Sequence, residues 1–161
     1  MFERLKTPEE LYNYKLGAAL KMEHTVLDML DDNAENARDP QLTQLFRHHQ
    51  DETRQQIANL EQAFAAFGWE PEDSPCPTVE ALEKEAKMTV KKTDDALVDH
   101  VLVMGAAETE HHEIAVYEGL ISEARAMGKD DVVRLLQQNL EQEEHTLEEV
   151  KSATERVVAM A

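Results

Sequence analysis

The sequence predicts an all-α protein built as an up-down bundle of four long helices. Its composition favours helix, with 5 Gly, 5 Pro and 5% aromatic residues among 161. Apolar residues also recur every three or four positions in four long segments, which is typical of helices with one buried face. With 42% apolar residues, a chain of this length can bury roughly two thirds of its surface, so residues 1–161 are expected to form a single domain.

The first two helices are expected over residues 8–33 and 40–67. Thr7 can cap the first helix, and the proline that follows suits the first helical position. Asp39, again followed by proline, repeats this signal, and Gly68 ends the second helix. These two segments therefore predict an antiparallel helical hairpin.

The second half of the chain predicts another hairpin, reached through a long crossover. Three prolines in residues 71–77 exclude helix there, and a short amphipathic helix is expected over 79–90. Long helices are expected over 93–127 and 130–158, separated by Gly128. Two hairpins joined by a long crossover make the ferritin-like arrangement of a four-helix bundle.

The charge of the chain bears on its partners. With 34 acidic and 16 basic residues, its formal net charge is −18, which repels phosphate backbones and anionic lipid heads. No apolar run approaches the roughly 20 residues that span a bilayer, and the N-terminus lacks the apolar segment of an export signal. We therefore expect no nucleic-acid and no membrane partner. The single cysteine, Cys76, allows no internal disulfide and favours the reducing cytoplasm.

Each long helix carries charge in the middle of its apolar stripe. The four stripes are Leu16, Leu20, Glu23, Leu27 and Leu30; Leu42, Leu45, His49, Glu52, Gln56 and Leu60; Val103, Ala106, Glu110, Glu113, Tyr117 and Leu120; and Leu136, Leu140, Glu143, Leu147 and Val150. One such acid alone would most simply be a solvated residue in a misassigned stripe. Four stripes broken at mid-helix indicate a shared feature of the core.

The depths of these acids agree. Glu23 and Glu52 lie at mirrored positions about the first predicted turn, and Glu113 and Glu143 do so about Gly128. At 1.5 Å rise per residue, each pair lies roughly 21 to 23 Å from its turn. The acids are therefore expected to converge on one layer of the bundle.

Carboxylates gathered in an apolar core repel and desolvate one another at a cost of about several kcal/mol each, unless cations neutralise them. Two divalent metal ions would do so, and oxygen ligands with an imidazole suit iron or manganese. The expected metal ligands are Glu23, His49, Glu52, Glu110, Glu113 and Glu143, with Glu23, Glu52, Glu110 and Glu143 also expected to be catalytic.

Other polar residues admit two interpretations. His49 shares a face with Glu52 and is favoured as a ligand over a hydrogen-bonded core histidine. His111 is expected to support a ligand rather than to bind metal, since it lies about 100° around the helix from Glu110. Tyr117 either donates to a ligand oxygen or simply packs in the core. Surface or rim positions are expected for His24, His48, His112 and His145, and a structural role for Cys76.

Five segments resemble, in order, the YciE/YciF ferritin-like stress-protein family. They are residues 23–27 (Glu-His-Thr-Val-Leu), 46–53 (Phe-Arg-His-His-Gln-Asp-Glu-Thr), 76–82 (Cys-Pro-Thr-Val-Glu-Ala-Leu), 110–117 (Glu-His-His-Glu-Ile-Ala-Val-Tyr) and 140–143 (Leu-Glu-Gln-Glu). The resemblance covers about residues 9–150. It implies a rubrerythrin-like helical bundle, a homodimer, a non-haem di-metal centre at the six residues named above, and a stress-related ferroxidase role.

The sequence departs from the usual ferritin pattern at two points. The second helix reads His49-x-x-Glu52 rather than Glu-x-x-His, and Thr146 stands where a second histidine would fall. The pair Glu110 and Glu113 resembles the extra carboxylate of rubrerythrins, which can replace the missing imidazole.

The function expected from these observations is a centre of two iron ions that oxidises Fe(II) with peroxide or dioxygen. A di-manganese enzyme of the catalase or peroxidase type uses similar ligands. The missing histidine also leaves open a non-catalytic, stress-induced binding protein whose metals only hold the fold.

Overall fold

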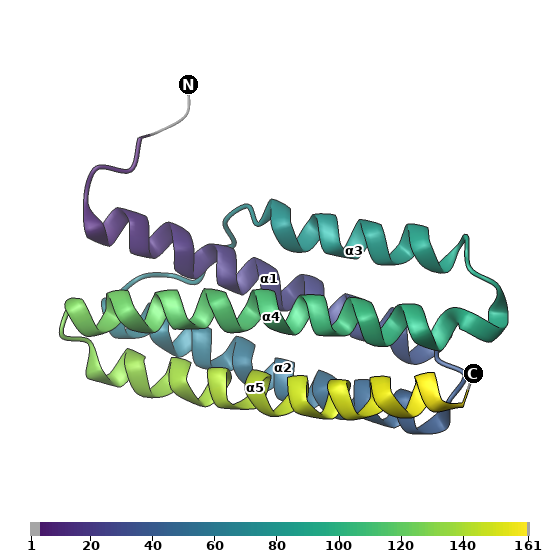
Figure 1. The fold of residues 1–161 in the computed structure, drawn as a ribbon. Helices are drawn as coiled ribbons and strands as arrows, with labels where there is room; N and C mark the ends of the chain where they lie inside the picture. Colours follow the sequence, from purple (N-terminus) through teal and green to yellow (C-terminus); the bar gives the residue numbers. More distant parts are fainter. Residues whose placement is uncertain (1–3, 161) are drawn as a thin grey trace.

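The computed structural model describes residues 4–160, and within them the chain is all-helical (Figure 1). Its elements in chain order are α1 (Pro8–Asn36), α2 (Pro40–Phe67), α3 (Pro77–Val90), the 3-10 turn η1 (Asp95–Leu97), α4 (Val98–Ala126) and α5 (Asp130–Ala159). The expected all-α fold is confirmed.

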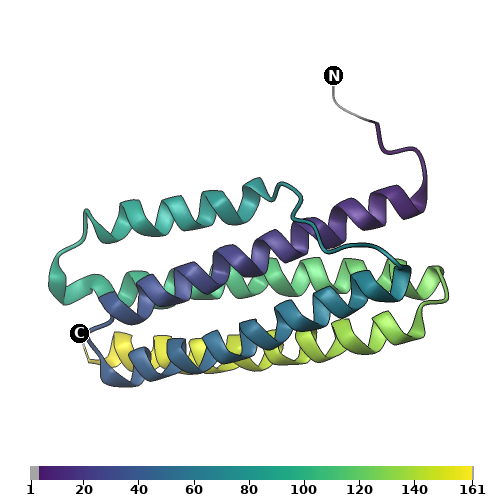
Figure 2. The same ribbon diagram turned by 180° about the vertical axis from the view of Figure 1, so that it is seen from behind.

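The four long helices pack as two antiparallel hairpins. Helix α1 pairs with α2 and α4 pairs with α5, while α2 lies against α5 and α1 against α4 (Figures 1 and 2). The chain leaves α2 and crosses to α3, which lies on the outside of α4 and α1. Every long helix therefore turns one face to a common core.

Local signals in the sequence account for the helix ends. Thr7 caps α1, where its hydroxyl accepts from the Glu10 backbone N–H at 3.1 Å and the Glu10 carboxylate binds back to the cap. Asp39 caps α2 by accepting from the backbone N–H of Gln41 at 2.8 Å. Gly68 and Gly128 end their helices with φ of 72° and 68°, left-handed values that favour glycine.

The largest boundary error lies at the start of α4, which begins at Val98 rather than at Thr93. Asp94 accepts from the backbone N–H of Ala96 at 3.1 Å and thereby caps the 3-10 turn η1 instead of a long helix. Helix α1 also runs three residues past its expected end, to Asn36, and α3 begins two residues early, at Pro77. None of these shifts moves the middle of a helix.

The apolar core runs the length of the bundle between the four long helices. Three leucines placed in the predicted stripes, Leu27, Leu45 and Leu140, are only half-buried. Val26, next to Leu27, and Phe46, next to Leu45, are only 2% and 1% exposed. The buried faces of α1 and α2 are thus rotated slightly from the leucine rows.

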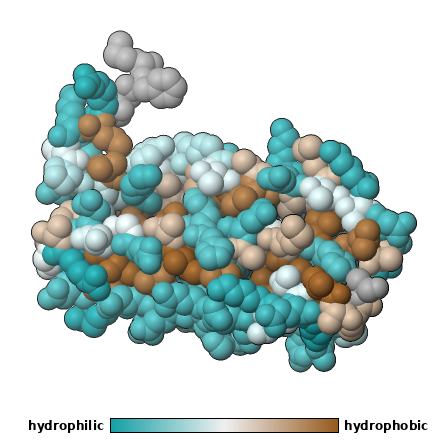
Figure 3. Space-filling view, in the orientation of Figure 1, coloured by the Kyte–Doolittle hydropathy of each residue, from teal (hydrophilic) through white to brown (hydrophobic). Residues whose placement is uncertain are grey.

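Hydrophilic residues cover much of the outer face, with apolar side chains visible in bands between the helices (Figure 3). Among the described residues, no helix has the length and apolar character needed to cross a membrane.

The crossover packs tightly against α1 at Gly17. A Cβ atom built there would lie 2.6 Å from the Glu72 carbonyl oxygen and 2.6 Å from Ser74 Oγ, well inside contact distance. At Gly119 in α4 a Cβ would meet nothing within 4 Å. Only the first of these glycines is therefore required by packing.

We predict that Gly17→Ala lowers the free energy of unfolding by about 1–3 kcal/mol, because the crossover backbone must move away from α1. The matched change Gly119→Ala should leave it unchanged or raise it by up to about 1 kcal/mol, through helix propensity alone. Urea unfolding followed by circular dichroism measures both changes. Equal effects of the two substitutions would contradict the close packing at Gly17.

Candidate metal centre

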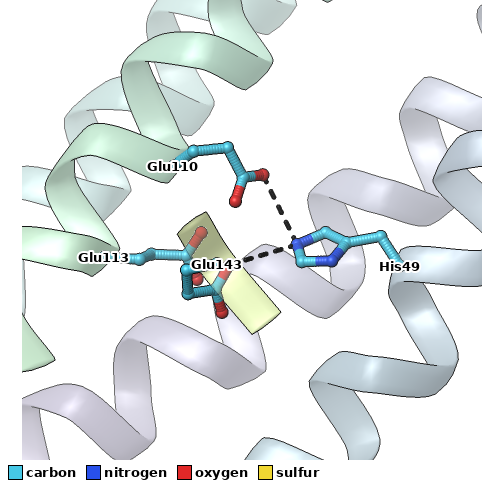
Figure 4. Close-up of side chains that lie close together, drawn as sticks. All are labelled: His49, Glu110, Glu113 and Glu143. Atoms are coloured by element: carbon cyan, nitrogen blue, oxygen red, sulfur yellow. Dashed lines mark ion pairs between the residues drawn. The ribbon is translucent and has the colours of Figure 1, made fainter. Parts of the chain in front are cut away.

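Four of the predicted ligands come together in the middle of the bundle (Figure 4). His49 is supplied by α2, Glu110 and Glu113 by α4, and Glu143 by α5. Each offers one ligand atom, and these atoms all lie within 4.8 Å of one another. All four residues are buried, with at most 2% of their surface exposed.

The imidazole of His49 faces two carboxylates. Its Nε2 atom lies 3.4 Å from Glu110 Oε1 and 3.6 Å from Glu143 Oε2, the two pairs drawn as dashed lines in Figure 4. Glu113 lies beside Glu143 in the same view. A nitrogen and several oxygens therefore converge on one small volume.

Many polar atoms of this cluster lack a hydrogen-bond partner within the described part of the chain. They are both carboxylate oxygens of Glu113 and of Glu143, Oε2 of Glu110 and Nε2 of His49. A buried polar group left without a partner costs about 1–3 kcal/mol, and more when it is charged. Cations bound among these atoms would satisfy them, and the oxygen-rich donor set with one imidazole suits iron or manganese. The residues present therefore fit a metal site.

Burial raises the pKa values of Glu110, Glu113 and Glu143 above the ordinary 4.5. Repulsion from Glu143 raises the pKa values of Glu110 and Glu113 further, whereas His49 partly offsets the effect at Glu143. Without a cation, the folded chain therefore holds protons on this cluster more strongly than the unfolded chain does.

Glu23 of α1 borders the cluster on its closed side. It is 0% exposed, and burial together with the charge of Glu143 raises its pKa well above the ordinary value. The hydroxyl of Tyr117 donates to Glu23 Oε1, while Oε2 lacks a hydrogen-bond partner in the described part of the chain. Asn139 in turn donates to the Tyr117 hydroxyl oxygen at 3.0 Å and to the Gln56 carbonyl at 3.2 Å. This chain of hydrogen bonds fixes the position of one Glu23 oxygen.

Glu52 of α2 also borders the cluster, beside His49, and is the more exposed of the two bordering acids. Its side chain is 16% exposed, and Oε2 lies 3.3 Å from His49 Nδ1. The hydrogen bond with His49 lowers the pKa of Glu52. Thr146 stands where the usual ferritin pattern would have a second histidine. Its hydroxyl donates to Glu52 Oε2 at 3.3 Å and lies 3.2 Å from His49 Nδ1. His48 Nε2 lies 3.8 Å from the other Glu52 oxygen but is largely exposed.

The hydroxyl of Thr146 also orients the imidazole. Because it donates to Glu52, its oxygen lone pairs are free to accept a hydrogen bond from His49 Nδ1–H. That arrangement leaves Nε2 unprotonated toward Glu110 and Glu143, as a metal-binding histidine requires.

The six sequence-predicted ligands thus fall into a core of four with Glu23 and Glu52 bordering it. His111, expected to support a ligand, is exposed and faces away, so that expectation was wrong. His24, His48 and His145 are exposed and His112 is half-buried. The sequence reasoning missed Asn139, although a polar residue one turn before Glu143 on a buried face was a signal.

Four long helices, a long crossover and a buried Glu/His cluster together define a ferritin-like helical protein, and the cluster indicates metal binding. Residues 7–161 match the family described as "Domain of unknown function (DUF892)", and the chain belongs to this family. The predicted resemblance to the YciE/YciF family is confirmed by the match to one of its members, YciF. YciF from Escherichia coli (strain K12) is 28% identical over 144 residues, which cover 88% of this chain and 87% of YciF.

Solved structures agree with this assignment. The E. coli stress protein YciF superposes with a TM-score of 0.91 at 26% identity, covering 98% of this chain and 100% of that one. YcfI from Rhodopseudomonas palustris gives a TM-score of 0.90 at 33% identity, covering 94% and 98%. A structure from Bacillus anthracis described as ferritin-like, diiron-carboxylate gives 0.71 over 93% and 99%, and at 17% identity this likeness shows the fold alone.

The raised pKa values predict how the metal-free protein responds to pH. The protonated carboxyl groups of the cluster stabilise the folded chain fully below pH 4.5, the ordinary pKa of a glutamate. This stabilisation is lost as pH rises through the higher pKa of the folded state. Metal-free protein should therefore become more stable as pH falls from about 8 to about 5.

Glu113→Gln isolates this effect from the falling net charge of the whole chain. At pH 8 it should raise the free energy of unfolding of metal-free protein by about 1.4 kcal/mol for each unit by which the folded pKa exceeds the unfolded one. The gain should shrink toward pH 5. Glu118→Gln, on the exposed side of the same helix, removes the same charge and should show no such trend. A parallel response of the two variants in thermal unfolding would refute a high pKa at Glu113.

Proposed function

We propose that this protein binds two Fe(II) ions per chain as substrate and oxidises them with hydrogen peroxide or dioxygen. The observation that carries the proposal is the buried cluster itself, in which Glu113 and Glu143 offer four carboxylate oxygens that have no hydrogen-bond partner among residues 4–160. The ions would be held by His49, Glu110, Glu113 and Glu143, with Glu23 on the closed side and Glu52 on the solvent side.

Charge favours the oxidised product. When ionised, the five carboxylates named above carry five negative charges, which attract each Fe(III) ion more strongly than each Fe(II) ion. In a site of low dielectric, fixed negative groups stabilise the more highly charged metal ion. With peroxide the balanced reaction is 2 Fe²⁺ + H₂O₂ + 2 H⁺ → 2 Fe³⁺ + 2 H₂O, which consumes both the oxidant and the reactive ferrous ion.

The chain's other residues position the ligands. Tyr117 and Asn139 hold Glu23, and Thr146 holds His49 and Glu52. Such supports reduce the rearrangement that metal binding requires. Because YciF is described as a stress protein, we propose that this chain likewise acts in stress protection, in the reducing cytoplasm that suits its single cysteine.

Stopped-flow mixing of Fe(II)-loaded protein with hydrogen peroxide should give a ferric absorbance that saturates at about two irons per chain. The absence of such a species in intact protein would overturn the proposal. Oxygen release from peroxide by manganese-loaded protein would indicate the catalase-like alternative. A lower melting temperature after chelation, without redox change, would indicate metals that only hold the fold.

His49 and His48 provide a matched pair within this experiment. His49→Gln should weaken one of the two metal positions and lower the rate of oxidation at least about tenfold, since it removes the imidazole from the cluster. His48→Gln should change the rate by less than about twofold, because the His48 side chain is 62% exposed and its Nε2 atom lies 3.8 Å from Glu52 Oε1, beyond hydrogen-bond distance. Equal losses in both variants would contradict the assigned face of α2.

We further propose a homodimer, in line with the family resemblance. Leu11 and Tyr14 of α1 are 44% and 37% exposed. They line a largely apolar cavity of about 600 Å³ beside α4 that a second copy could cover. Sedimentation should give twice the 18.3 kDa mass of one chain. A mass of one chain at micromolar concentration would contradict the dimer.

A further inference from the structure

A groove of about 340 Å³ runs along the seam between α2 and α5. All its lining side chains are polar; they include Glu52 and Gln55 from α2, and Glu141, Gln142 and His145 from α5. Most of these offer oxygen atoms, which are the ligands that hard divalent cations prefer. The groove therefore presents a surface on which a hydrated cation can exchange water for protein oxygens.

The groove reaches Glu52, at the edge of the candidate metal centre. Of the six predicted ligands, five are at most 2% exposed, whereas the Glu52 side chain is 16% exposed and lines the groove. Its Oε2 atom lies 3.3 Å from His49 Nδ1. Glu52 is thus the one predicted ligand that contacts both the solvent and the cluster.

Gln142 also lines the groove. Its amide oxygen is buried and lacks a hydrogen-bond partner among the described residues. Glu141, the preceding residue, is exposed at the mouth and adds a negative charge there. A cleft lined with charge of one sign raises the local concentration of the opposite ion and speeds its arrival.

We infer that this groove is the route by which divalent cations enter and leave the centre. Glu141 attracts the hydrated ion, the Gln142 amide oxygen replaces part of its water shell, and Glu52 passes it to the buried ligands. This inference rests on the proposed metal site, and it assigns transit functions to Glu141 and Gln142, which do not hold the bound ions.

The route makes a kinetic prediction that a ligand role does not make. An obstacle in a passage slows entry and exit by the same factor, so the rates change while the equilibrium affinity does not. Loss of a ligand changes the affinity instead.

Gln55→Trp places a bulky side chain at an exposed position of the groove. Stopped-flow binding of Co(II), followed through its visible d–d absorption, measures association without any redox reaction, and a competing chelator measures release. Both rate constants should fall at least about fivefold, with the stoichiometry and the dissociation constant unchanged. Gln62→Trp is the control, because Gln62 is exposed on the same side of α2, seven residues on, and outside the groove.

Charge is tested with Glu141→Gln, which should lower the Co(II) association rate about threefold at low salt and weaken its dependence on ionic strength. Glu144→Gln is the control, since Glu144 is exposed on the same helix and does not line the groove. Circular dichroism and the melting temperature verify that each variant folds as the parent does.

The outcomes separate the two proposals. If the parent protein binds no Co(II) at the cluster, the proposed metal site fails. If it binds Co(II) and both groove variants match their controls in rate, the route is wrong while the metal site stands. A changed stoichiometry or affinity in Gln55→Trp would also overturn the route, because it would indicate damage to the site itself.

Discussion

The energetic constraint on which this structure depends is the burial of carboxylates at the middle of its helices. Glu23, Glu113 and Glu143 are 0% exposed and Glu110 is 2% exposed. A folded domain is stable by only about 5–15 kcal/mol. Several unneutralised buried charges at a few kcal/mol each would be comparable with that whole margin. The fold can therefore hold these carboxylates at one depth only if protons or cations neutralise them. Whether protons or cations do so decides what the protein can do.

The polar residues around the cluster serve the same constraint. Asn59 donates to Asn139 Oδ1 at 2.7 Å, and Asn139 donates to the Tyr117 hydroxyl, which donates to Glu23. This buried network links α2, α5, α4 and α1 in turn, so it fixes the rotation of each helix about its axis. A purely apolar core would hold the helices together but would leave these rotations less well defined.

The sequence predicted the layer of acids well because only two regularities were needed, namely the helical period and the equal depth of mirrored positions in a hairpin. It predicted rotation less well. His111 differs from Glu110 by one position, about 100°, and only packing against neighbouring helices decides which of the two faces inward. The start of α4 was missed because Asp94 caps a 3-10 turn, a local alternative that helix propensity does not reveal. The donors Tyr117 and Thr146 lie 94 residues from the oxygens they bind, so their partners are set by the tertiary fold.

The two departures from the usual ferritin pattern are coupled through Thr146. A histidine at this position would carry a second imidazole toward the cluster, whereas the smaller threonine leaves room and contacts both His49 and Glu52. By holding Nδ1 of His49, it directs Nε2 toward Glu110 and Glu143. By donating to Glu52, it keeps that carboxylate at the boundary between the groove and the centre. A cluster with one imidazole and an oxygen-rich solvent side therefore follows from the two departures together, and Glu52, its most exposed ligand, lies where an incoming cation would first meet the cluster.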